Sequence, residues 1–90
     1  MYLVVVTVDT PGWNASVDIL HKELSTSASG SDGLQHAYLE AGDERLAISL
    51  YLQAPDEQHA ATLADQLCRR VLASVSPAGR WSVQSVHIGP

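Results

Sequence analysis

The chain changes its hydrophobic period several times, and the order of these changes predicts its secondary structure. Tyr2–Val8 is a short apolar run rich in β-branched residues, and Asp9-Thr10-Pro11-Gly12 follows it as a turn. Consecutive valines in this run make both faces of the predicted strand apolar, which is typical of a central strand. Steps of three and four then predict a helix, with Thr10 as its cap, Pro11 at its first position and one buried stripe: Trp13, Val17, Leu20 and Leu24.

The second part of the chain predicts two strands, a helix and a last strand. Leu34–Glu40 and Arg45–Gln53 flank a four-residue hairpin loop, which places Glu40 opposite Arg45. A helix begins near Pro55 and ends at Pro77-Ala78-Gly79. Arg80–Ile88 is the final strand, and the helix before it has this buried stripe: Ala60, Leu63, Ala64, Leu67, Val71 and Val75.

This order of elements predicts an α+β fold. Two β-α-β halves of this length are typical of the ferredoxin-like βαββαβ sandwich. Right-handed crossovers would place both helices on one face of a four-stranded antiparallel sheet in the order 4-1-3-2. We expect one domain over residues 1–90, with a flexible Ser/Gly-rich loop at 25–33.

The sheet face without helices is predicted to be an interface. The first strand offers valines to both faces, and the hairpin register places Tyr38, Ser49 and Tyr51 on the open side. A large apolar patch rarely stays exposed on a soluble monomer. We therefore expect a homodimer or a protein partner on this face.

Composition and charge exclude several classes of protein. The formal net charge is −5, with 10 acidic and 5 basic residues, so nucleic acid is not an expected partner. The longest apolar run is far shorter than the ~20 residues of a membrane span, and the N-terminus does not resemble a signal peptide, so we expect a cytoplasmic protein without membrane contact. The single cysteine, Cys68, excludes an internal disulfide and is expected to be a small buried hydrophobe.

Candidate chemistry is sparse. The sequence has no HExxH, GxSxG, P-loop or GxGxxG motif, so we predict no catalytic residue, no metal ligand and no cofactor. His36 and His87 are predicted to lie on the open face, on strands at opposite edges of the sheet. They are candidate ligand-binding residues that could meet only across a dimer.

The opening of the chain resembles an ACT domain, a ligand-sensing family with the same βαββαβ order. The family's hallmark is Asp-x-Pro-Gly after the first strand, which here is Asp9-Thr10-Pro11-Gly12. Glycine allows close backbone approach, and proline starts a helix. The resemblance implies a small effector near this loop at a subunit interface, with Asp9, Pro11 and Gly12 as binding candidates.

Two functions from different classes follow. The preferred one is a small non-enzymatic regulatory or adaptor module that self-associates or docks through its sheet and senses a small molecule. The alternative is a small dimeric α/β-barrel enzyme with a substrate pocket between two sheets. In that case, four side chains would line the pocket: His36, Tyr38, Tyr51 and His87.

Overall fold

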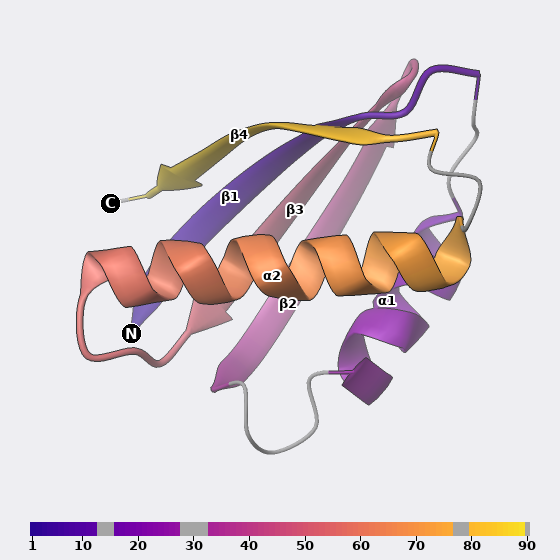
Figure 1. Cartoon of the computed structure of the whole chain (residues 1–90). Coiled ribbons are helices and arrows are strands. Elements are labelled where there is room, and N and C mark those ends of the chain that lie inside the picture. Colours follow the sequence, from indigo (N-terminus) through magenta and orange to yellow (C-terminus); the bar gives the residue numbers. More distant parts are fainter. Residues whose placement is uncertain (13–15, 28–32, 77–79, 90) are drawn as a thin grey trace.

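Six elements follow one another in the order β-α-β-β-α-β in a computed structural model that describes residues 1–12, 16–27, 33–76 and 80–89. Figure 1 shows the helix α2 lying across the sheet, with α1 beside it. The bounds of the elements are β1 Tyr2–Asp9, α1 Val17–Ser27, β2 Leu34–Gly42, β3 Arg45–Leu52, α2 Glu57–Val75 and β4 Ser82–Ile88.

The sheet confirms the predicted fold class. Its order is β2-β3-β1-β4, which is the expected 4-1-3-2 order seen from the other edge, and every neighbouring pair is antiparallel. The fold is therefore α+β and ferredoxin-like, and β1 is central as its apolar faces predict. One core fills the space between the sheet and the helices. Its buried members include Val4, Val6 and Val8 of β1, Leu46, Ile48, Leu50 and Leu52 of β3, Leu20 and Leu24 of α1, and Ala60, Ala64, Leu67, Cys68, Val71 and Leu72 of α2.

The hairpin between β2 and β3 corrects the predicted register. Gly42, not Glu40, lies opposite Arg45, so the turn has two residues, Asp43 and Glu44. The predicted Glu40–Arg45 pair is therefore wrong, and Nε of Arg45 instead lies 3.6 Å from Oδ1 of Asp9. A shift of two residues preserves the side-chain alternation, so each side chain remains on its predicted face.

The first helix begins later than predicted. Ser16 caps α1, because its hydroxyl accepts from the amide of Ile19 at 3.4 Å and its carbonyl accepts from the amide of Leu20 at 3.0 Å. Thr10 is buried and its amide donates to the carbonyl of Glu44 at 2.9 Å, so Thr10 belongs to the strand end and not to a helix cap. Trp13 lies outside the described residues.

Helix α2 and strand β4 have nearly the bounds that the sequence predicts. Asp56 caps α2 by accepting from the amide of His59 at 2.8 Å, and Ser76 ends the helix. Strand β4 has a register shift opposite Thr7 and Val8, so its alternation changes along its length. Residues 25–27 belong to α1 and not to the flexible loop predicted at 25–33. Residues 28–32 and 77–79 lie outside the described residues.

None of the helices in the described part of the chain is long and apolar enough to cross a membrane.

Candidate functional site

The sheet face opposite the helices is the candidate functional site, and strand pairing arranges its side chains in rows. One row is formed by Tyr38, Ser49, Val5 and His87, from edge to edge. The row towards the start of β1 contains His36, Tyr51 and Leu3. On the other side of the Tyr38 row lie Glu40, Ala47, Thr7 and Ser85, followed by Gly42, Arg45 and Asp9. We call this surface the open face.

The two ends of the open face differ in chemistry. His36, Tyr38 and Tyr51 gather at one end, and the rings of His36 and Tyr38 meet edge to face with centroids 4.6 Å apart and an interplanar angle of 72°. Tyr38 is 60% exposed, which is unusual for a large aromatic side chain. Asp9 and Arg45 form an ion pair at the other end. The aromatic end is therefore suited to a flat apolar group, and the charged end to a polar one.

Small and half-buried residues separate the aromatic side chains from His87. Ser49 and Val5 occupy the centre of the Tyr38 row, and Ala47 and Thr7 occupy the centre of the next. The middle of the open face therefore carries short side chains, and larger ones lie towards its edges. Hydroxyl and imidazole groups on this surface can exchange hydrogen bonds or protons with a bound molecule.

The structure places His36 and His87 on the open face but does not bring them together. His36 is on β2 and His87 on β4, and both β3 and β1 lie between them. Both side chains are exposed. Any site that uses both imidazoles needs a ligand that spans the sheet or a second copy of the chain.

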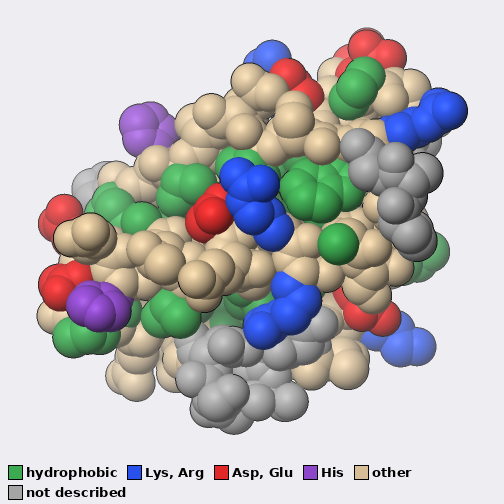
Figure 2. Space-filling view, in the orientation of Figure 1, with side chains coloured by type: hydrophobic (Ala, Val, Ile, Leu, Met, Phe, Trp, Pro, Cys, Tyr) green, Lys and Arg blue, Asp and Glu red, His purple; other side chains and the backbone are tan. Residues whose placement is uncertain are grey.

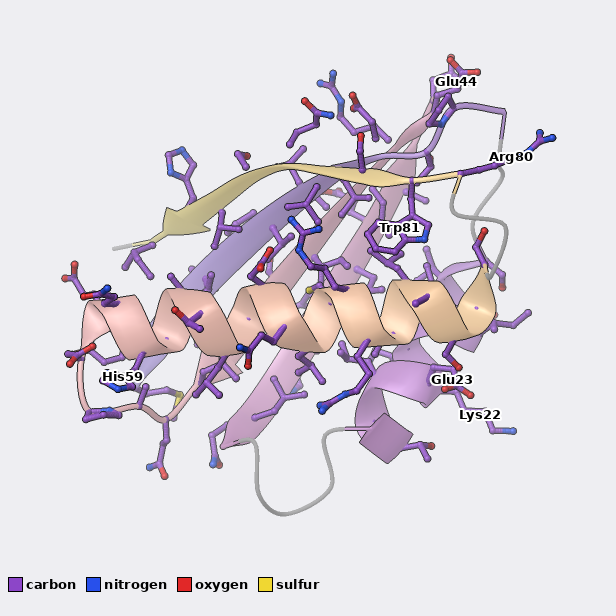
Figure 3. The ribbon with its side chains drawn as sticks, viewed as in Figure 1. Lys22, Glu23, Glu44, His59, Arg80 and Trp81 are labelled. Carbon is purple, nitrogen blue, oxygen red and sulfur yellow. The ribbon has the colours of Figure 1, made fainter. Side chains whose placement is uncertain are left out.

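The loop after β1 is held by the β2–β3 turn. The amide of Gly12 donates to Oε1 of Glu44 at 3.1 Å, and Figure 3 shows Glu44 at the tip of the hairpin with Arg80 at the same end of the molecule. Pro11 lines an open hollow of about 340 Å³ together with Asp9, Asp43, Glu44, Arg45 and Ser82. The amide of Gly12, in the loop that the ACT resemblance assigns to an effector, thus binds a carboxylate of the chain itself. No feature of the residue pattern indicates this contact between residues 32 positions apart.

Cys68 lies in the core under α2. Burial, followed by the negative charge of Asp65, raises the pKa of its thiol from 9.0 to about 12. A thiol with this pKa carries almost no thiolate at neutral pH. In the described ranges, no three histidine, cysteine or acidic side chains form a group that could hold a metal ion.

Trp81 is a half-buried residue that the sequence pattern did not single out. Its indole points from just before β4 towards α2 in Figure 3, on the helix side of the sheet. Its Nε1 is buried and has no hydrogen-bond partner within the part of the chain that the structure describes. Figure 2 shows hydrophobic side chains between β4 and α2, so this indole contributes to the core and not to the open face.

Comparisons with known proteins support the fold. No protein-family model matches the sequence, and no curated protein does. Among solved structures, the chain is similar to a protein from Chloroflexus aurantiacus that is described provisionally as an antibiotic biosynthesis monooxygenase. The two are 21% identical, the likeness covers 98% of this chain and 89% of the other, and the TM-score is 0.53. At this identity, the likeness establishes the ferredoxin-like fold alone.

This comparison corrects the predicted function. The preferred prediction, a non-enzymatic regulatory or adaptor module, is contradicted because the protein that shares the fold is described as an enzyme. The description of that protein agrees better with the alternative, a small dimeric α/β-barrel enzyme, which stays a prediction for this chain. The resemblance to ACT domains stays a prediction, since the comparison supports only the wider fold.

Proposed function

We propose that the protein is a small enzyme that acts as a homodimer, with two open faces enclosing a substrate pocket. The row of Tyr38, Ser49, Val5 and His87 carries this proposal, because it combines a ring, a hydroxyl, an apolar floor and an imidazole on one uncovered surface. A second open face would exclude bulk water from this surface and strengthen the polar interactions between its side chains and a substrate.

The side chains of the open face favour a flat aromatic substrate with hydroxyl or carbonyl groups. The tyrosine rings offer stacking surfaces, which contribute about 0.5–1.5 kcal/mol for each aromatic pair beyond the area buried. Ser49 and the two histidines offer hydrogen bonds to oxygen atoms at the edge of such a molecule.

His36 and His87 are the proposed proton-transfer groups. An imidazole is suited to removing a proton from a phenol, because histidine is the side chain that most often serves as a general acid or base. Face-to-face association would supply a histidine to each end of the pocket from one copy or the other. The description of the Chloroflexus protein makes the oxidation of a phenol to a quinone by O₂ the first reaction to test: one oxygen atom of O₂ enters the ring, and the other leaves as water with the two hydrogen atoms and the electrons that the phenol gives up.

The experiment combines oxygen uptake with a panel of hydroxylated naphthalenes and anthracenes. We expect uptake with at least one compound, and lower kcat in His36→Gln and in His87→Gln. His59→Gln is the matched control, because His59 lies at the start of α2, away from the open face, as Figure 3 shows. Oxygen uptake unaffected by both open-face variants, or no uptake together with no thermal stabilisation by any compound, would overturn the proposal.

A further inference from the structure

Strand β2 forms one edge of the sheet and has few of the features that keep sheet edges from pairing. It is nine residues long, contains neither lysine nor proline, and has its register shift at Gln35, near its start. Strand β4, at the opposite edge, has seven residues and a register shift within it. Of the two edges, β2 is the longer and the more regular.

The helix beside this edge leaves it accessible. An open groove of about 480 Å³ runs between α1 and β2, and it is lined by residues of both elements, including His21, Lys22, Ala37 and Tyr38. The side chains of His36, Tyr38 and Glu40 are all exposed. The described residues of α1 therefore leave an open groove beside β2.

The central residues of β2 are complementary to themselves when the strand is reversed. They read His36-Ala37-Tyr38-Leu39-Glu40. In an antiparallel pair centred on Tyr38, each His36 lies opposite Glu40 of a second copy, and each Ala37 lies opposite Leu39. On the open-face side, His36 of each copy would pair with Glu40 of the other. On the helix side, the small Ala37 of each copy would pack against the larger Leu39 of the other.

We propose that β2 pairs with β2 of a second copy of this chain, antiparallel and centred on Tyr38, so that two sheets become one continuous sheet. A two-fold axis through Tyr38 makes the contact closed and isologous. Backbone hydrogen bonds hold the two strands together, and the His36–Glu40 pairs set the register. The backbone pairing uses the edge of the sheet, whereas the proposed enzyme uses its open face. Because His36 takes part in both, the tests below measure cross-linking and association and not activity.

Disulfide trapping tests the register. In Tyr38→Cys, the new thiol lies opposite the same thiol of the second copy across the two-fold axis, so we expect a covalent dimer under mild oxidation. Glu40→Cys is the matched control on the same strand and face, because residue 40 lies opposite residue 36 of the second copy. Cys68 is buried and does not compete. Equal trapping of the two variants, or none in Tyr38→Cys, would overturn the register.

Charge reversal tests the pairing without a cross-link. His36→Glu places carboxylates opposite each other, and we expect sedimentation to show association weakened about tenfold. Glu40→Lys removes the acid from each His36–Glu40 pair and is expected to weaken association as well. The double variant His36→Glu/Glu40→Lys restores opposite charges, so association should recover. A double variant as weak as the single ones would refute the pairing, and Tyr51→Asp, which acts on the open face, separates this result from a failure of the proposed enzyme dimer.

Discussion

The backbone amide of Gly12 donates a hydrogen bond to the carboxylate of Glu44, with 3.1 Å between the nitrogen and Oε1. The backbone carbonyl of Glu44 also accepts a hydrogen bond from the amide of Thr10 at 2.9 Å. The φ of Glu44, 52°, lies in the left-handed region. One turn residue therefore holds the loop that follows β1. We expect Glu44→Ala to lower the free energy of unfolding by about 0.5–1.5 kcal/mol, the usual value of one hydrogen bond. Glu44→Gln keeps an acceptor oxygen and should lie near the parent in urea unfolding; equal losses in both variants would exclude a role for this bond.

Gly33 has a stricter requirement for glycine than Gly12. Both have positive φ, 70° and 68°, but a Cβ at Gly33 would lie 2.6 Å from the carbonyl oxygen of Gln53, whereas one at Gly12 would meet Nη1 of Arg80 at 3.8 Å. We expect Gly12→Ala to cost about 1–2 kcal/mol, the conformational term alone. Gly33→Ala adds a backbone collision and should cost more. Chemical denaturation of the two variants checks the order, and a smaller loss at position 33 would contradict this geometry.

Neighbouring residues of β3 should respond in opposite ways to the same substitution. Leu50 is fully buried, so Leu50→Asp places an unpaired charge in the core and should unfold the domain. Tyr51 lies on the open face, so Tyr51→Asp should leave the fold intact and weaken the proposed face-to-face dimer. Circular dichroism reports the fold, and size-exclusion chromatography with light scattering reports the mass. A Tyr51→Asp protein with the parent's mass would count against the face-to-face contact.

Cys68 should make the stability of the fold depend on pH in the alkaline range. The folded-state pKa of about 12 lies above the ordinary value of 9.0, because burial disfavours the thiolate. Above pH 9 the unfolded chain loses a proton that the folded chain keeps, so the free energy of unfolding falls between pH 9 and about 12. Cys68→Ala should show a smaller fall over this range. In the parent at pH 8, we also expect a thiol reagent to react only after denaturation, and rapid labelling of the native protein would refute the burial.

The capping residue of α2, Asp56, should make the stability of the fold depend on pH in the acidic range. The amide of His59, followed by its imidazole, lowers the pKa of Asp56 below 3.8. The cap's charge therefore stabilises the fold above pH 4, and this contribution is lost as the pH falls through the folded-state pKa. Asp56→Ala should lower Tm at pH 7, and Asp56→Asn, which keeps an acceptor, should lower it less. Equal Tm values for the two variants at pH 7 would show that the charge and not the acceptor matters.

The sequence by itself determined which way most side chains point. Leu46, Ile48 and Leu50 alternate with smaller or polar residues, and a period of two assigns them to one face whatever their neighbours are. The valines of β1 likewise identified a central strand. For this reason the fold class, the strand order and the content of the open face followed from the residue pattern, even though the hairpin register was wrong by two positions.

Only the tertiary structure decided the contacts between distant residues. The Asp9–Arg45 pair, the bond from Gly12 to Glu44 and the irregular pairing of β4 depend on how strands align in space, and many alignments satisfy the same hydrophobic pattern. Local periodicity specifies a face, whereas a site depends on the distances between elements, which the packing of the whole core sets.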